Sequence, residues 1–371
     1  MKLTIERAAL FRSLGHVQSI VERRNTIPIL SNVMLEATDG RLGLTATDMD
    51  IAIVESVPAV IDTAGSTTAP AHTLYDIVRK LPDGAQIELD SSSDGQMALR
   101  AGRSEFTLQT LPTEDFPQTD GGDLPHQFAL PANDLRGLID RTRFAISTEE
   151  TRYYLNGIFM HTTAGDSGDV MRSVATDGHR LARVEMPVPD GATGMPGVIV
   201  PRKTVGELRK LIDEIGDDID IALSDTSVRF AFDNAVLTSK LIDGTFPDYE
   251  RVIPTGNDKS LNVDCRSFAD AVDRVATIST EKSRAVKMAA AGNNLVLTAS
   301  SPDSGTAREE IEVDYDADAI EIGFNARYLL DIAQQIEGSE AEFVVADAAS
   351  PTIVRDSEDD SALYVLMPMR V

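Results

Sequence analysis

The chain has 371 residues and a net charge of −26, with 60 acidic and 34 basic side chains. This length allows two or three domains, each with its own hydrophobic core. A single cysteine, Cys265, excludes an intrachain disulfide, which is typical of the cytoplasm. Charged residues interrupt the N-terminus, and no apolar run approaches the roughly 18 residues of a membrane span, so we expect neither a signal peptide nor a membrane helix.

Predicted elements recur in the same order with a period of about 125 residues. Each repeat begins with an amphipathic helix, because apolar residues recur at three- and four-residue spacing. Strands follow, then a second and shorter helix, then further strands. The first helices are expected over Arg7–Arg24, Pro131–Ser147 and Cys265–Ser279, and the second over Ala71–Leu81, Pro201–Ile215 and Asn325–Ile336.

Tight-turn dipeptides join many of the predicted strands. Asp39-Gly40 separates strands over 32–37 and 41–46, Asp177-Gly178 follows a strand over 170–175, and Gly292-Asn293 joins strands over 285–290 and 294–298. Strands joined by hairpins favour antiparallel sheet, and two helices per repeat can cover one face of it. We therefore predict an α+β fold of three similar domains, each with two helices on antiparallel sheet. Polar stretches containing Gly and Pro place the domains at 1–125, 126–258 and 259–371.

The charges are distributed unevenly along the chain. Six helical windows (7–24, 72–80, 131–147, 201–215, 264–279 and 325–337) contain 16 basic and 12 acidic residues, so they carry +4 and everything else carries −30. One explanation is that helix surfaces favour Lys and Arg. The other is that the helices form a face turned toward a polyanion. In that case the candidate phosphate contacts are Arg23-Arg24, Arg79-Lys80, Arg141 with Arg143, Arg202-Lys203 and Arg209-Lys210.

Asp177 and His179 could suggest a metal site or an acid/base pair. However, the five histidines show no His-x-x-x-His spacing, and the first repeat has Asp48-Met49-Asp50 in the equivalent place. No phosphate-cradling Gly-rich loop or Gly-x-Ser-x-Gly elbow is present. We therefore read Asp177-Gly178 as a turn with His179 and Arg180 presented beside it, and we expect no catalytic residue, metal or cofactor.

Several segments together resemble the sliding clamps of bacterial replication, the β subunits of DNA polymerase III. The resemblance covers nearly the whole chain. It is carried by Asn25–Leu30, Tyr153–Gly157, Val174–Ala182, Ile199–Lys203, Thr238–Leu241, Phe246–Tyr249 and Tyr364–Arg370.

The resemblance implies a ring of two subunits whose helices line a hole for duplex DNA and whose sheets form the rim. Such a protein tethers the replicative polymerase without reading sequence and without catalysing a reaction. It implies binding to the clamp loader and to other proteins with a clamp-binding motif. It also implies DNA contacts from Arg24, Tyr153, Tyr154, Arg202 and Lys203, with Phe106 and Ile278 at the dimer interface.

The resemblance further implies a peptide pocket between the second and third domains. Its Leu, Val, Met and Pro side chains would form an adaptable apolar groove. The implied pocket residues are Leu155, Thr176, Gly178, His179, Arg180, Leu181, Pro247, Arg251, Val252, Ala349, Pro351, Val365, Leu366, Met367, Pro368, Met369 and Arg370.

The sequence departs from the family pattern in two places. Ala349 and Pro351 stand where polar or aliphatic residues are common, and Glu149-Glu150 precedes the tyrosine pair. An acidic pair facing phosphate would weaken a DNA contact at that loop. We weigh three hypotheses: a DNA-encircling clamp and docking hub, a hydrolase or metal enzyme using Asp177 and His179, and a ring or scaffold protein that binds peptides but not DNA.

Overall fold

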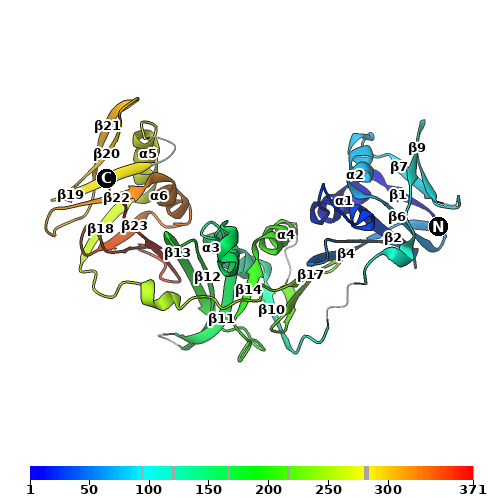
Figure 1. The fold of residues 1–371 in the computed structure, drawn as a ribbon, viewed down its shortest axis with the longest axis horizontal. Helices are drawn as coiled ribbons and strands as arrows, with labels where there is room; N and C mark the ends of the chain where they lie inside the picture. The colour runs from blue at the N-terminus through cyan, green and yellow to red at the C-terminus, as the bar shows by residue number, and fades with distance from the viewer. Residues whose placement is uncertain (94, 119–121, 166–167, 215–217, 280–283, 371) are drawn as a thin grey trace. The chain divides into compact units, whose positions relative to one another are not determined.

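The computed structural model describes all residues except 94, 119–121, 166–167, 215–217, 280–283 and 371. Two compact units are present (Figure 1). The first contains Met1–Arg136, Pro189–Pro196 and Lys203–Leu241, and the second contains Gly137–Val188, Gly197–Arg202 and Ile242–Val371.

The described residues contain six α-helices, each inside a predicted helical segment. They are α1 (Arg7–Ile20), α2 (Ala71–Lys80), α3 (Ala132–Arg143), α4 (Arg202–Ile212), α5 (Cys265–Ala276) and α6 (Ala326–Ala333). Short 3-10 turns are η1 (Pro28–Ser31), η2 (Thr113–Asp115), η3 (Glu150–Leu155) and η4 (Tyr249–Val252).

The predicted helices are too long at their C-terminal ends. Helix α1 stops at Ile20 because Val21 is extended, with φ −73° and ψ 120°. The next three residues, Glu22, Arg23 and Arg24, are polar and exposed, so they add nothing to the buried face that stabilises a helix. Arg24 therefore lies in a loop and not on a helix.

The first unit contains two sheets. The five-stranded sheet is ordered β5 (Val60–Thr63), β1 (Lys2–Glu6), β7 (Gln86–Asp90), β8 (Gln96–Ala101), β9 (Ser104–Gln109). The eight-stranded sheet is ordered β10 (His126–Pro131), β15 (Asp218–Leu223), β16 (Ser227–Ala231), β17 (Ala235–Lys240), β4 (Ile51–Pro58), β3 (Arg41–Thr47), β2 (Asn32–Thr38), β6 (Gly65–Pro70).

The second unit also contains two sheets. One has eight strands, ordered β14 (Val198–Pro201), β11 (Gly157–Gly165), β12 (Gly168–Thr176), β13 (Arg180–Pro187), β25 (Ala362–Leu366), β24 (Thr352–Asp356), β23 (Glu340–Val345), β18 (Lys259–Asp264). The other is ordered β21 (Gly305–Glu312), β20 (Asn294–Ser301), β19 (Ala285–Ala291), β22 (Ile320–Asn325). The strand pairs are antiparallel, as predicted.

The observed repeat is β-α-β-β-β written twice, with one added strand, β5, in the first repeat. The sequence analysis does not predict the strand that precedes each helix. These strands are short and run directly into the helix, as β14 does at Pro201. Strand β6 reads Gly-Ser-Thr-Thr-Ala-Pro, which lacks the apolar alternation that marks a strand.

Each eight-stranded sheet joins two successive repeats at one strand pair, which we call a seam. The first seam pairs β4 with β17, with Ile51 opposite Ser239. The second seam pairs β13 with β25, with Arg180 opposite Leu366. Strands β9 and β21, which correspond to β17 and β4, stand at the ends of their sheets in the described part of the chain.

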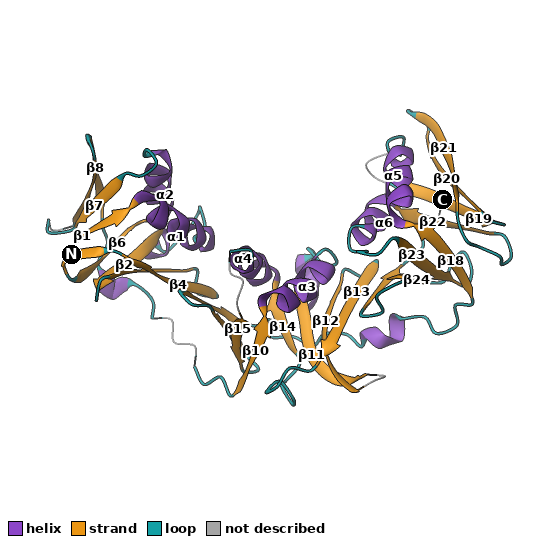
Figure 2. Cartoon of the chain, turned by 180° about the vertical axis from the view of Figure 1, so that it is seen from behind, coloured by secondary structure: helices purple, strands orange, loops and turns teal. Residues whose placement is uncertain are grey.

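The two helices of the first repeat, and the two of the third, pack together against strands of their sheets. In Figure 2, α1 and α2 lie together against the strands of the first unit, and α5 and α6 lie together in the second. Helix α1 contacts β1, β3 and β4 through a buried face that contains Leu10, Leu14 and Val17. Helix α5 begins after its N-cap residue, Asp264, whose Oδ1 accepts a hydrogen bond from Ser267 N at 2.8 Å.

A polar cluster fixes α1 to the sheet beneath it. The Glu55 carboxylate on β4 is buried and accepts hydrogen bonds from Ser13 Oγ at 2.7 Å and from His16 Nδ1 at 2.8 Å. His16 Nε2 lies 3.0 Å from Glu214 Oε1, and Glu214 also pairs with Arg12. Burial alone would lower the pKa of His16, but the hydrogen bonds and charges of the two carboxylates raise it above 6.5.

The stability of the first unit should therefore fall as pH rises. A raised folded-state pKa gives a contribution that is fully present below pH 6.5 and is lost as pH rises through the folded value. We expect the urea midpoint of the wild type to decrease over that window and the midpoint of His16→Gln to stay flat. His126→Gln, at a histidine with no carboxylate partner in the described residues, is the control and should behave as wild type. A wild-type midpoint that rises across the window would contradict this account.

Candidate functional site

The turn between β12 and β13 is built by Asp177. Its Oδ1 accepts hydrogen bonds from His179 N at 2.9 Å and Arg180 N at 3.0 Å. Gly178 has φ +87°, a left-handed conformation that glycine adopts without a Cβ clash. The Asp177 carboxylate therefore stabilises a turn, as the sequence predicts.

His179 and Arg180 differ in exposure, although both lie beside the Tyr328 ring. His179 is exposed, as predicted, but the prediction is wrong for Arg180, whose side chain is buried. The Arg180 guanidinium pairs with Asp177 and Asp331 and lies 4.3 Å from the centre of the Tyr328 ring. Arg180 thus fastens the turn to α6.

An apolar cluster lies beside this turn. Leu155, Leu181 and Val365 pack with buried residues that the sequence analysis does not assign to the site, namely Val174, Ile199, Phe246 and Tyr249. Val252 and Met367 expose 47% and 41% of their surface. Val252 ends the turn that contains Tyr249, and Met367 follows the strand that contains Val365. Exposed apolar side chains in segments that contribute to a buried apolar cluster are typical of an interaction surface.

Leu366 does not belong to this cluster. Successive residues of a strand point to opposite faces, and Leu366 faces Phe268 and Leu329 in the core under α5 and α6. Val365 and Leu366 are therefore separated by the sheet, although the sequence analysis places both in the pocket.

The C-terminal tail crosses the seam beyond β25. Met367 N donates to His179 O at 2.9 Å, and Met369 N donates to Gly323 O at 2.8 Å. Pro351 precedes Thr352, which is opposite Leu366. Of the remaining predicted pocket residues, Thr176, Pro368 and Met369 are half-buried, and Pro247, Arg251, Ala349 and Arg370 are exposed.

Arg152 is a site residue that the sequence analysis misses. A Cβ on Gly178 would lie 2.6 Å from Arg152 Nη1, so this guanidinium covers the glycine. Arg152 Nε also donates to Glu149 Oε2 at 2.8 Å, and this hydrogen bond lowers the pKa of Glu149. The three-residue spacing of the two charges was the available signal. Glu149, one of the two acidic residues expected to weaken a DNA contact, is thus in an ion pair with Arg152.

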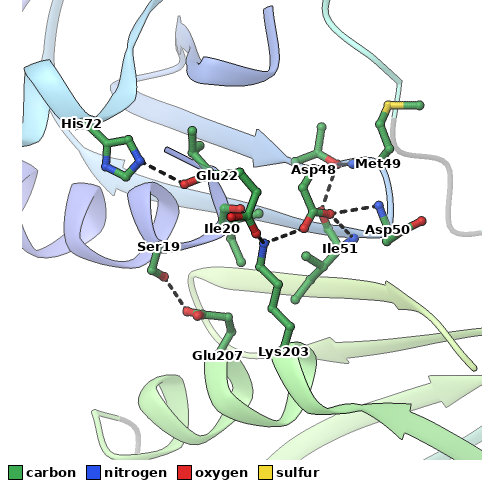
Figure 3. A network of polar contacts seen from close by, with 12 residues as sticks. Ser19, Ile20, Glu22, Asp48, Met49, Asp50, Ile51, His72, Lys203 and Glu207 are labelled. Carbon is green, nitrogen blue, oxygen red and sulfur yellow. Dashed lines mark hydrogen bonds and ion pairs between the residues drawn. The ribbon is translucent and has the colours of Figure 1, made fainter. Parts of the chain in front are cut away.

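Lys203 is held inside the first unit (Figure 3). Its ammonium contacts Ile20 O at 3.0 Å, Glu22 Oε1 at 2.5 Å and Asp48 Oδ2 at 2.6 Å. Burial opposes the charge, but the hydrogen bonds and charges of the two carboxylates raise the pKa of Lys203. An ammonium has three N–H donors, so none remains for a phosphate. Lys203 therefore connects α4 to the end of α1 and to the turn before β4.

The other predicted DNA contacts are more accessible. Arg24 and Arg202 are exposed, and their side chains have no hydrogen-bond or ion-pair partner among the described residues. Tyr153 is 53% exposed, and its ring meets the half-buried Tyr154 edge to face at 5.8 Å. These side chains can meet a polyanion without first breaking an ion pair.

The two predicted interface residues belong to, or follow, elements at the sheet ends, because β9 is an end strand and α5 contacts the end strand β21. Phe106 is half-buried on β9, and Ile278 is half-buried just after α5.

No cluster of three or more His, Cys, Asp or Glu side chains that could hold a metal occurs in the described residues. Likewise, none of the described helices is long and apolar enough to cross a membrane.

Comparison with known proteins matches three domain models along the chain. Residues 1–120 match the N-terminal domain of the DNA polymerase III beta subunit, 129–248 its central domain and 250–370 its C-terminal domain. The beta sliding clamp of Caulobacter vibrioides is 58% identical over 372 residues, and that of Escherichia coli K12 is 38% identical over 374, with both chains fully covered in each case.

Solved structures give the same result. The C. crescentus beta sliding clamp with bound PEG has a TM-score of 0.98 and 58% identity, covering 100% of this chain and 99% of that one. The Bartonella birtlesii sliding clamp bound to griselimycin has a TM-score of 0.97 and 51% identity, with both chains fully covered.

The chain therefore belongs to the family of bacterial DNA polymerase III beta subunits, the beta sliding clamps. This confirms the resemblance and the three-domain clamp fold predicted from sequence. It also assigns the chain to DNA replication as a processivity clamp and docking hub that catalyses no reaction itself.

Replacing Gly178 should destabilise the second unit. Gly178→Ala puts a Cβ into the left-handed region and against Arg152, so the free energy of unfolding should fall by at least about 1 kcal/mol. Gly137→Ala is the control, because Gly137 lies in α3 of the same unit and a Cβ there would make an ordinary contact at 3.9 Å. That change should stabilise by up to about 1 kcal/mol. Urea denaturation measures both, and equal effects would contradict the assigned turn.

Proposed function

We propose that two copies of this chain close into a ring around duplex DNA and hold the replicative polymerase there through a peptide groove at the second seam. The observation that carries the proposal is the repeated seam. The pairing of β4 with β17 and of β13 with β25 joins successive repeats twice in one chain.

A third pairing of the same kind requires a second copy. Strand β21 corresponds to β4 and β13, and β9 corresponds to β17 and β25. Pairing β21 of one copy with β9 of the other would be head-to-tail and would close after two copies. It would also cover two strand edges that otherwise invite aggregation. Phe106 on β9 and Ile278 after α5 are the proposed interface residues.

The proposed DNA contacts are Arg24, Arg202, Tyr153 and Tyr154. The two arginines supply charges that the described residues leave unpaired, and Tyr153 offers an exposed ring. Such contacts go to the phosphate backbone and carry no sequence information. Lys203 is left out because its three donors are already used.

The proposed peptide groove has Leu155, Leu181 and Val365 as its floor, with Val252 and Met367 at its rim. Partners would be the polymerase, the clamp loader and other proteins with a clamp-binding motif. A flexible Met at the rim suits a groove that accepts several sequences.

The proposal also includes domain limits and a location. The chain has three domains, at 1–125, 126–258 and 259–371, and it acts in the cytoplasm. The domain limits are supported by β10 beginning at His126 and β18 at Lys259, and the location by the family's part in DNA replication.

Arg24 and Lys203 should differ in DNA binding. Each phosphate contact contributes about 0.9 to the slope of log K against log salt concentration. Arg24→Ala should reduce the slope for a short duplex by about that amount. Lys203→Ala should leave the slope unchanged but lower the urea midpoint, because it removes the contacts with Glu22 and Asp48. Fluorescence anisotropy across a salt series measures the slope. A smaller slope for Lys203→Ala would show that this residue binds phosphate.

Two changes test the peptide groove. Deleting Met367 through Val371 should abolish binding of a polymerase C-terminal peptide and leave the dimer intact. Val252→Asp changes an exposed side chain, so it should keep the wild-type urea midpoint and weaken the peptide by about 1–3 kcal/mol. Isothermal titration measures peptide binding and sedimentation measures the dimer. Normal peptide binding by both variants would place the groove elsewhere.

A further inference from the structure

A second groove lies at the first seam, entirely within the first unit. It is a cavity of about 270 Å³ whose walls include Met49, Asp50, Ala52, Pro117, Thr238 and Lys240. This seam corresponds to the one that carries the proposed peptide groove, and the likeness extends to individual backbone hydrogen bonds.

The turns at the two seams have the same internal bonds. Thr47 Oγ1 donates to Ile51 O at 2.9 Å, and Thr176 Oγ1 donates to Arg180 O at 2.7 Å. In each turn the same threonine oxygen also accepts from the backbone N–H two residues later, at 3.0 Å and 3.1 Å.

The aspartates of the two turns are also equivalent. Asp48 Oδ1 accepts from Asp50 N at 3.0 Å and from Ile51 N at 2.9 Å, which repeats the two bonds made by Asp177 Oδ1. One further hydrogen bond recurs across each seam. At the first seam Lys240 N donates to Asp50 O at 2.8 Å, and at the second Met367 N donates to His179 O at 2.9 Å. The first seam therefore repeats the backbone frame of the second.

Met49 occupies the place of Gly178 and keeps its left-handed backbone, with φ +82° against +87°. For a residue with a Cβ this conformation costs about 1–2 kcal/mol. Met49 also exposes 50% of its surface. Backbone strain together with an exposed, flexible apolar side chain is typical of a binding site.

The floor of the first seam has smaller side chains than the second, so the cavity above it is deeper. Ala52 is opposite Thr238, where the second seam places Leu181 opposite Val365. The Thr238 hydroxyl and the nearby Ser227 hydroxyl have no hydrogen-bond partner among the described residues. The cavity can thus take one or two side chains and offers two hydroxyls to a backbone.

The rim carries charges that the second seam lacks. Asp50 and Lys240 stand where the second seam has His179 and Met367, and they form an exposed ion pair at 3.1 Å. An exposed pair is worth little, so a ligand can replace either partner. The net charge of −26 favours a ligand that brings a cation to Asp50.

We propose that the first-seam groove binds a short extended peptide with one aliphatic and one basic side chain. The aliphatic side chain lies over Ala52 beside Met49, the basic side chain pairs with Asp50, and Thr238 and Ser227 bond the peptide backbone. The groove is a docking site additional to the proposed polymerase groove, and it rests on the proposed function for the inference that this backbone frame takes peptides.

The two seams each carry a methionine that can report binding. In the full-length protein labelled with ¹³C-methyl methionine, the signals of Met49 and Met367 are assigned by their loss in Met49→Leu and Met367→Leu. The probes are Ac-Gly-Leu-Arg-Gly-NH2, its glutamate counterpart Ac-Gly-Leu-Glu-Gly-NH2, and a polymerase C-terminal peptide. We expect the arginine peptide to shift Met49 and leave Met367 unmoved, and the polymerase peptide to shift Met367.

Variants separate the contributions. Asp50→Asn should weaken the arginine peptide several-fold, and Ala52→Leu, which introduces the side chain of the second seam, should abolish its binding while the polymerase peptide still shifts Met367. Lys240→Met should strengthen the arginine peptide two- to threefold by removing the competitor for Asp50. No shift of Met49, tighter binding of the glutamate peptide, or unchanged binding by Ala52→Leu would each overturn the proposal. If Met367 fails to respond to the polymerase peptide, the proposed function is at fault and not this inference.

Discussion

The antiparallel pairing at the two seams is the interaction on which the rest of this structure depends. It turns three repeats into continuous sheets, so that the repeats are held by backbone hydrogen bonds as well as side chains. Each seam ends at a turn built by an aspartate, Asp48 or Asp177. The turn fixes where the next strand starts, and at the first seam the residues around it line a cavity.

The two seams are secured differently on their helical side. At the first seam, Lys203 contacts Asp48 and Glu22. At the second, Arg180 contacts Asp177 and Asp331 and lies over the Tyr328 ring. In both cases a basic side chain of the kind that binds phosphate forms ion pairs with carboxylates of the protein instead. In this acidic chain, the proposed contacts with the duplex then come from Arg24 and Arg202, which have no ion-pair partner among the described residues, and such weak backbone contacts suit a protein that must slide.

The sequence alone predicts the repeats, the six helices and the antiparallel class, because apolar spacing and turn dipeptides are local signals. It does not predict which strands pair across repeats, since nothing in β4 or β17 alone specifies the partner. Strand β6 is missed for lack of alternation, and the length of α1 is overestimated because Arg23 and Arg24 are good helix formers with no buried face to support them.

The candidate functional site is predicted only in part, again because the sequence does not specify which distant segments come together. Leu155, Leu181 and Val365 are brought together as the resemblance implies, and Arg152 completes the turn although the sequence analysis omits it. The fate of a charged side chain depends on partners far away in the chain. Lys203 contacts Asp48, which is 155 residues away in the sequence, and Arg180 contacts Asp331, which is 151 residues away. No local sequence pattern predicts pairs with such separations.

The central claim is that the protein holds DNA by closing around it. The direct measurement loads the protein, with a clamp loader, onto a nicked circular plasmid and follows it by gel filtration in high salt before and after the plasmid is cut once. The account predicts that the protein stays with the circle and is released from the linear DNA, because a closed ring is held by topology and its contacts are weak. Equal retention on circular and linear DNA, or loss from both, would contradict it.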